Sequence, residues 1–319
     1  MNLNPGSVAT MHRRVAALLL ASGACLSLAL TACGTSASSG DSSGPGSGEK
    51  LQVVAAFYPL EYAVERVGGD AVSVTNLTRA GVEPHDLELT PQAVAKVSSA
   101  RLAAYLKGFQ PALDQAIADQ AATTAYDVSA DADLTLTGAQ DGLGTQTKDP
   151  HFWLDPIRYG KVVTALGAKL GEIDAAHKAD YVRNAAAFVD ELDALDQELS
   201  RGLAHCANRT LVTSHAAFGY LGERYQLTEH AIGGLSPDQE PEAAKLAQIA
   251  TYVKDQGITT IYTETLVSPA VAQTVARESG ATTAVLDPIE GLSDASAGTN
   301  YGEIMRANLA TLKKGQTCS

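Results

Sequence analysis

The stretch "AAHKADYVRNAAAFVDELDALDQELSRGL", residues 175–203, sets the architecture that the rest of the chain must fit. Its apolar residues recur at alternating steps of four and three, at Tyr181, Ala185, Phe188, Leu192, Leu195 and Leu199. That spacing places them on one face of a single long helix. Because strand and helix patterns lie on both sides of this segment, we expect it to join two lobes rather than form a lone coiled coil. A cleft between the lobes follows from this arrangement.

Short β-branched runs alternate with helical stretches along the rest of the chain. The runs that we interpret as strands are residues 51–57, 71–78, 210–215, 258–264 and 282–288. Alternation of this kind predicts an α/β fold with parallel-type sheets flanked by helices. Thr90-Pro91 and Ser268-Pro269 each indicate an N-cap followed by proline at the first helical position, and Gly280 marks a helix end.

The first residues indicate export. His12, Arg13 and Arg14 precede an apolar run from Val15 to Leu30, an order typical of a secretory signal over residues 1–32. A membrane-spanning anchor is the alternative, but the run is short for one. "LTAC", residues 30–33, resembles the bacterial lipobox, which predicts a lipid on Cys33.

The residues after the predicted lipid attachment point lack the apolar groups needed to order a segment. Residues 33–50 therefore form the lipid-bearing cysteine and a flexible linker, and the folded part is expected from Leu51 onward. Removing residues 1–32 takes away two of 23 basic side chains and none of 36 acidic ones, which leaves a formal charge of −15. Such acidity excludes nucleic acid as an expected partner and is compatible with, but no proof of, cation binding.

Two cysteines are left for the folded part of an exported chain. Cys25 lies in the predicted signal and Cys33 would carry lipid, so Cys206 and Cys318 are expected to form a disulfide. Closing a loop on the order of 100 residues would stabilise the fold by roughly 4 kcal/mol on the chain-entropy model.

Three histidines share a structural context. His85 follows the strand at 71–78, and His215 ends the strand at 210–215. His151 lies in "DPHFWLDP", residues 149–156, where two prolines stiffen the chain. Asp287 ends a further strand, and open α/β sheets bind ligands at the carboxyl ends of their strands. Three imidazoles and a carboxylate would form a four-coordinate site suited to zinc.

The alternative is that these are unrelated loop histidines, since their wide spacing forms no local motif. Among the remaining histidines, His177 and His205 are expected to be solvated, whereas His230 could be either solvated or functional.

Six motifs follow one another over nearly all of residues 51–316: "AAFYPLEYAVERVGGD", "PHDLELTPQ", "DPHFWLDP", "TSHAAFGYLGERYQL", "YTETLVSP" and "LDPIEGL". In this order they resemble the cluster A-I metal-binding lipoproteins, the solute-binding proteins of ATP-driven zinc and manganese importers. The resemblance implies two similar lobes, at residues 51–173 and 205–319, joined by a rigid helix at 174–204. It also implies a buried metal bound by His85 and His151 from the first lobe and by His215 and Asp287 from the second.

The third ligand position distinguishes subclasses of this family, because manganese members resemble one another in having a glutamate there. His215 therefore favours the zinc subgroup. Glu264 is expected as a competing ligand or as a hydrogen-bond partner of a metal-bound imidazole. Residues 127–149 hold five aspartates, one lysine and no histidine, where many zinc members carry a histidine-rich loop. We expect a solvated loop there, with a second cation site as the alternative.

The expected function is that of a monomeric, lipid-anchored receptor on the outer face of the cytoplasmic membrane. It would capture Zn²⁺, carried as cargo, for the permease of an ATP-driven importer, and it would catalyse no reaction. The alternatives are a manganese receptor of the same family, a surface adhesin, or a zinc hydrolase. The hydrolase would need an open coordination position and a general base, and the chain has no His-Glu-x-x-His sequence.

Overall fold

The computed structural model describes residues 49–139, 146–237 and 241–319, all within one compact unit, Ser47–Ser319. The predicted signal at 1–32, the lipid attachment point Cys33 and all but the end of the linker lie outside the described residues. The same holds for positions 140–145 of the acidic stretch. Within the described ranges, no helix combines the length and apolar character needed to cross a membrane.

The first lobe is built on a four-stranded parallel sheet. Its strands are β1 (Leu51–Ala55), β2 (Val72–Asn76), β3 (Leu102–Tyr105) and β4 (Ala125–Asp127), in the order β2-β1-β3-β4. Helices α1 (Tyr58–Gly68), α2 (Pro91–Ser99) and α3 (Pro111–Gln120) connect these strands. Parallel neighbours require such crossovers, so the sheet is covered by helices and its strands can be apolar.

The second lobe repeats this plan. Its strands are β7 (Thr210–Thr213), β8 (Thr228–Ala231), β9 (Thr260–Thr263) and β10 (Thr282–Val285), in the order β8-β7-β9-β10. Helices α6 (Gly219–Tyr225), α7 (Ala243–Asp255) and α8 (Ala270–Ser279) connect them. Numbered from its own first strand, each sheet has the order 2-1-3-4, which confirms two similar α/β lobes.

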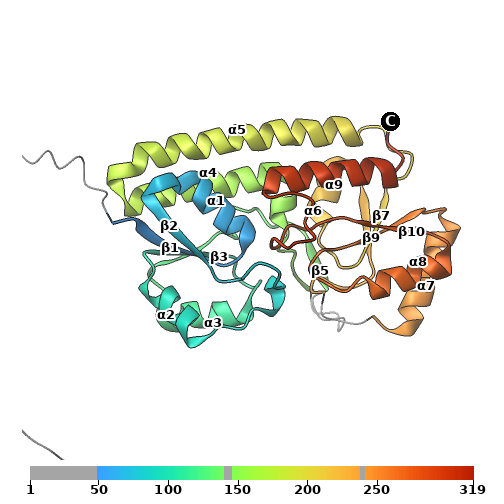
Figure 1. Cartoon of the computed structure of the whole chain (residues 1–319), viewed down its shortest axis with the longest axis horizontal. Helices are drawn as coiled ribbons and strands as arrows, with labels where there is room; N and C mark the ends of the chain where they lie inside the picture. The colour runs from blue at the N-terminus through green and yellow to red at the C-terminus, as the bar shows by residue number, and fades with distance from the viewer. Residues whose placement is uncertain (1–48, 140–145, 238–240) are drawn as a thin grey trace, which may run out of the picture. The chain divides into compact units, whose positions relative to one another are not determined.

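The helix expected between the lobes is α5 (Lys178–Leu203), 26 residues long. Figure 1 shows it running along both lobes, beside α4 (Pro156–Ile173) and α9 (Tyr301–Gly315). All six residues of the predicted apolar stripe are buried. Burial of each leucine or phenylalanine contributes about 1.5–3 kcal/mol. The helix begins three residues later than predicted, because Ala175–His177 form a separate 3-10 turn, η4.

Aromatic side chains fill the contact between the lobes beneath α5. Tyr159 of α4 packs against Tyr301 of α9, with ring centroids 4.9 Å apart. The hydroxyl of Tyr301 donates to the carbonyl of Trp153 at 2.6 Å, and the indole N–H of Trp153 donates to the carbonyl of Pro288 at 2.7 Å. The loop of Trp153 in the first lobe is therefore bonded to the loop of Pro288 in the second.

The predicted helix ends are confirmed at Thr90 and Gly280. The hydroxyl of Thr90 accepts the Ala93 N–H at the start of α2, and Gly280 ends α8 at φ 80°. The second predicted N-cap is displaced by one residue. Pro269, rather than Ser268, holds the cap position of α8, and the Ser268 hydroxyl accepts only the Ala270 N–H, at 3.4 Å.

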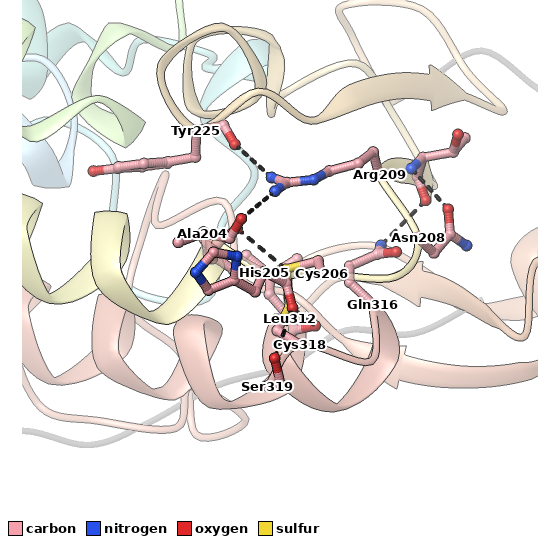
Figure 2. The surroundings of a disulfide bond; sticks show 12 residues. Ala204, His205, Cys206, Asn208, Arg209, Tyr225, Leu312, Gln316, Cys318 and Ser319 are labelled. Atoms are coloured by element: carbon pink, nitrogen blue, oxygen red, sulfur yellow. Dashed lines mark hydrogen bonds between the residues drawn. A yellow bond between two sulfur atoms is a disulfide. The ribbon is translucent and has the colours of Figure 1, made fainter.

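The predicted disulfide between Cys206 and Cys318 is present and links residues 112 positions apart. Figure 2 shows it between the segment after α5 and the C-terminus, where the Ser319 N–H donates to the His205 carbonyl at 3.0 Å. Nearby, the guanidinium of Arg209 donates to the backbone carbonyls of Ala204 and Tyr225. The last residues are thereby fixed to the start of the second lobe.

Three strands of the two lobe sheets are absent from the sequence-based assignment. These are β3, β4 and β8, with sequences LAAY, AYD and TEHA. They contain few β-branched residues, and pairing with neighbouring strands, rather than local propensity, determines their structure. The described part of the acidic stretch also forms a small antiparallel pair, β5 (Thr137–Ala139) with β6 (Gln146–Lys148).

Candidate metal centre

His85 lies at the 3-10 turn η2 (Pro84–Asp86), after β2. Glu83 caps this turn, since its Oε1 accepts the His85 backbone N–H at 3.1 Å. The imidazole packs edge-on against Phe109 at 4.5 Å, and only 6% of the side chain is exposed. A short capped turn against an aromatic ring thus holds the first predicted ligand.

His151 lies between β6 and the 3-10 turn η3 (Phe152–Leu154) and is completely buried. Oδ1 of Asp149 lies 2.9 Å from the His151 backbone nitrogen and 2.8 Å from its Nδ1. A carboxylate accepts hydrogen bonds, so this arrangement places a ring proton on Nδ1 and directs Nε2 toward Glu290, where an ion would displace any proton on Nε2.

His215 follows β7 and is held in the same way by a different carboxylate. Glu264, just after β9, accepts the His215 backbone N–H at 3.0 Å through Oε1 and lies 2.7 Å from Nδ1 through Oε2. Both carboxylate oxygens of Glu264 are thus engaged by His215. This is the hydrogen-bond partner role expected for Glu264, and not the role of a competing ligand.

The three imidazoles converge on Glu290, which follows β10. Its Oε1 lies 2.9 Å from Nε2 of His151, 3.2 Å from Nε2 of His215 and 3.4 Å from Nε2 of His85. One ligand atom from each of the four residues lies within 4.8 Å of the others. Two of the four come from each lobe, so the cluster forms where the lobes meet.

Asp287 is not part of this group. Its Oδ1 accepts the Ile289 N–H at 2.8 Å, within its own loop, and its backbone N–H donates to Asn308 at 2.9 Å. The chain then turns at Ile289, a buried β-branched residue at φ 57°. Such a left-handed turn is rare for isoleucine, and the side chain that follows it, Glu290, occupies the fourth position. The structure thus differs here from the expected ligand set.

The other histidines of the described ranges lie outside the cluster. His177 is 48% exposed at its side chain, and its Nδ1 lies 2.6 Å from Asp174. His230 is also exposed and bonds with the hydroxyl of Tyr252 at 3.1 Å. Three of the four predicted ligands are therefore brought together, whereas Glu290 and Asp149 were not predicted. Both lie inside motifs already singled out, "LDPIEGL" and "DPHFWLDP".

Burial and hydrogen bonding act in opposite directions on the histidines of the first lobe. Burial lowers the pKa of His85 and outweighs its attraction to Glu290. For His151, burial also favours the neutral ring, but hydrogen bonds to Asp149 and Glu290 prevail and raise its pKa. The two imidazoles therefore differ in proton affinity although they face the same carboxylate.

The charged groups of the second lobe shift one another's pKa values and also that of Glu83 in the first lobe. Burial acts to lower the pKa of His215, but the negative charges of Glu264 and Glu290 raise it well above the ordinary value. Burial would raise the pKa of Glu290, yet the positive charge of His215 and the hydrogen bond with His151 hold it well below its usual range. Burial, followed by the charge of Glu290, raises the pKa of Glu83 to about 10. Glu290 is thus an ionised carboxylate inside the protein.

The donor set fits a borderline-soft divalent cation. Three imidazole nitrogens and one carboxylate oxygen can form the four-coordinate N/O shell that zinc prefers. Nε2 of His85 and Oε2 of Glu290 are buried and have no hydrogen-bond partner among the described residues. Buried polar atoms without partners are costly, and ligation of an ion by these two residues would offset that cost.

Two similar α/β lobes, with three histidines and a glutamate converging where they meet, define a two-lobed binding protein with a site of metal-binding type. The chain belongs to the family described as "ZnuA: Zinc-uptake complex component A periplasmic", which matches residues 53–315. The family resemblance carried by the sequence motifs is thereby confirmed.

Individual relatives agree with this assignment. The zinc-binding lipoprotein AdcA of Streptococcus pneumoniae serotype 4 is 37% identical over 281 residues, which cover 83% of this chain and 56% of AdcA. The chain thus spans about half the length of that relative. The high-affinity zinc uptake system protein ZnuA of Bacillus subtilis is 34% identical over 301 residues, 90% of this chain and 93% of that protein.

A solved structure agrees as well. The crystal structure of the Zn(II)-bound ZnuA-like domain of Streptococcus pneumoniae AdcA superposes with a TM-score of 0.71 at 36% identity. The match covers 84% of this chain and 99% of that domain. The AdcA domain therefore corresponds in extent to the folded region described above.

Proposed function

We propose that this protein captures Zn²⁺ outside the cytoplasm and delivers it to the membrane permease of an ATP-driven importer. The observation that carries the proposal is the convergence of Nε2 of His85, His151 and His215 on Oε1 of Glu290 in a buried position between the lobes. These four residues would hold the ion, with Glu290 in the place first assigned to Asp287. Membership in a zinc-uptake family supports the same cargo.

The residues around the ligands prepare the site before the ion arrives. Asp149 and Glu264 fix the ring orientation and proton position of His151 and His215. Little ordering is then left for the binding step, which favours high affinity. Four side-chain ligands would complete a tetrahedral zinc shell without an open position for water, so the arrangement favours binding over hydrolysis.

Elemental analysis of the protein purified without added metal, followed by competitive titration of Zn²⁺ against Mn²⁺, tests the cargo. We expect zinc to be retained and to compete successfully, because the third imidazole makes the site softer than a set with two carboxylates. A preference for manganese would overturn the assignment based on His215.

His151→Ala tests the site itself. The variant should lose zinc affinity by more than about a hundredfold, since it removes a ligand whose supporting groups alone are worth 10–100-fold. His177→Ala is the control, because that imidazole is 48% exposed at the turn η4 and lies outside the cluster. Equal losses in the two variants would show that the cluster does not bind the ion.

We further propose that residues 1–32 are a signal, that Cys33 carries the lipid anchor and that residues 33–50 tether the lobes outside the cytoplasmic membrane. The lobes would then comprise residues 51–173 and 205–319, with 174–204 between them, in a monomeric protein. Cys33→Ser should release the protein from the membrane fraction without changing its zinc affinity. Unchanged membrane retention would contradict the lipid anchor.

Surface adhesion remains the alternative role, and it is tested separately. Retention of the purified, zinc-loaded protein on immobilised extracellular matrix proteins would favour adhesion. Zinc capture does not require such binding, so absence of retention would leave the zinc proposal unaffected.

A further inference from the structure

The candidate ligands are enclosed by the protein. His151 and His215 are fully buried, Glu290 is 1% exposed, and the His85 side chain is 6% exposed. An ion can therefore reach Glu290 only past some other part of the chain. His85 is the least enclosed of the four candidate ligands, so we expect the route for an ion to pass beside it.

Glu83 is two residues from His85 and has an unused carboxylate oxygen. Its Oε1 accepts the His85 backbone N–H, whereas its Oε2 is buried and has no hydrogen-bond partner among the described residues. Oε2 of Glu290 is buried and unpartnered in the same sense. The two loops are bonded to each other, since the Gly81 N–H donates to the Leu292 carbonyl at 2.8 Å.

A cavity of about 380 Å³ adjoins this part of the molecule. Glu83 from the first lobe and Ser214, Gly233 and Leu266 from the second are among the residues that line it. Ser214 immediately precedes the ligand His215, so the cavity is flanked by the neighbours of two ligands. Among the described residues that line it, Glu83 is the only one with a carboxyl group.

We propose that Glu83 is an exchange ligand, a carboxylate that holds the zinc ion through Oε2 while the ion passes between this cavity and the four-residue site. The inference rests on the proposed zinc-binding function and adds a route to it. A dication that leaves water is strongly disfavoured, and a carboxyl group on the way, which gives up its proton to the arriving ion, replaces part of the hydration shell. Glu83 would therefore accelerate capture and release alike, without being needed in the final complex.

Glu83→Gln separates this role from the others that Glu83 could have. Glutamine retains an oxygen that can accept the His85 N–H, so the turn η2 keeps its cap, but the amide that replaces Oε2 does not ligate a cation. Glu88→Gln is the matched control, because Glu88 is exposed on the same loop and undergoes the same replacement of a carboxyl by an amide.

The measurement is stopped-flow kinetics of Zn²⁺ binding and of Zn²⁺ release to an excess of chelator, together with the equilibrium Kd. We expect Glu83→Gln to slow both association and release by about tenfold, the low end of the effects of losing a supporting carboxylate at a metal site. The Kd should stay within about threefold of the wild-type value, because the two rates change together. Glu88→Gln should leave both rates unchanged.

Other outcomes overturn the inference in different ways. Slower association with unchanged release would show electrostatic steering only, and a loss of affinity as large as that of His151→Ala would make Glu83 a permanent ligand. Unchanged rates would show that Glu83 only caps the turn η2. If neither the wild-type protein nor Glu88→Gln bound Zn²⁺, the proposed zinc-binding function itself would be wrong.

A second variant covers the case in which Glu83→Gln folds poorly. Glu83→Asp supplies another favoured capping residue, but its side chain is one methylene shorter and withdraws the carboxylate from the route. It should show the same slowing of both rates, whereas rates equal to wild type would refute the role of Oε2.

Discussion

Glu264 holds His215 at two points, through the backbone N–H at 3.0 Å and through Nδ1 at 2.7 Å. Glu264 follows β9 and His215 follows β7, and these two strands are neighbours in the sheet of the second lobe. The position of the imidazole is therefore fixed by the sheet and not by its loop alone.

Replacing Glu264 should weaken zinc binding although it is no ligand. In Glu264→Gln, one of the two accepting oxygens becomes an amide group that donates, so either the His215 backbone or its ring loses its partner. We expect affinity to fall by about 10–100-fold, as is usual for the carboxylate partner of a ligating imidazole. Competitive titration measures the effect, and Glu278→Gln, an exposed change on α8, is the control. Affinity equal to that of the control would contradict this role.

The fourth ligand can be decided by comparing two variants. Glu290→Gln removes the charge that the three Nε2 atoms face, so zinc affinity should fall by more than about a hundredfold. Asp287→Asn retains an oxygen to accept the Ile289 N–H, and its affinity should stay within about fivefold of wild type. Isothermal titration of both variants with Zn²⁺ checks this. A larger loss in Asp287→Asn than in Glu290→Gln would restore Asp287 as the ligand.

The stability of the metal-free protein should depend on pH through Glu229. Its carboxylate accepts from the Thr213 hydroxyl and the Phe218 N–H, and burial raises its pKa from 4.5 to about 7. Below pH 4.5 the folded and unfolded chains both hold this proton. Between pH 4.5 and 7 the unfolded chain releases the proton first, so the contribution of Glu229 to stability decreases as the pH rises.

Glu229→Gln tests this dependence, because glutamine mimics the protonated carboxyl at every pH. The variant should gain stability over wild type as the pH rises through that window, by up to about 3 kcal/mol and less where solvent screens the group. Chemical denaturation in the presence of a chelator at several pH values measures the difference. A difference between the two proteins that does not vary with pH would rule out Glu229 as its source.

The disulfide should contribute to stability without taking part in zinc binding. It closes a loop of 112 residues, and Cys206→Ala combined with Cys318→Ala should lower the free energy of unfolding by about 2–5 kcal/mol. Zinc affinity should be retained, because no cysteine belongs to the candidate site in the described residues. Denaturation curves and zinc titrations of the double variant check both statements. A loss of affinity with the fold intact would show coupling between the two ends of the second lobe.

Much of the architecture was predictable because its signals are local. The apolar stripe of α5 from Tyr181 to Leu199 has helical spacing, which can be recognised in the sequence without knowledge of tertiary contacts. His85 and His215 could be placed together because both follow strands of parallel sheets, whose carboxyl ends form the binding edge.

The fourth ligand could not be obtained in this way. Asp287 and Glu290 both follow β10, and the choice between them depends on the backbone turn at Ile289. Nothing in the local sequence predicts a left-handed isoleucine, because packing in the buried loop imposes it. For the same reason β3, rich in alanine, was visible only once its pairing with β1 was known.

Trp153 is the only tryptophan of the chain, and it is fully buried. Its ring lies 5.3 Å from that of His151, and its N–H crosses to Pro288 in the other lobe. The ultraviolet emission that is specific to tryptophan therefore originates from a single point beside the candidate site. The protein carries its own optical reporter, placed where the arrival of an ion or a parting of the two lobes would alter the surroundings of one fluorophore.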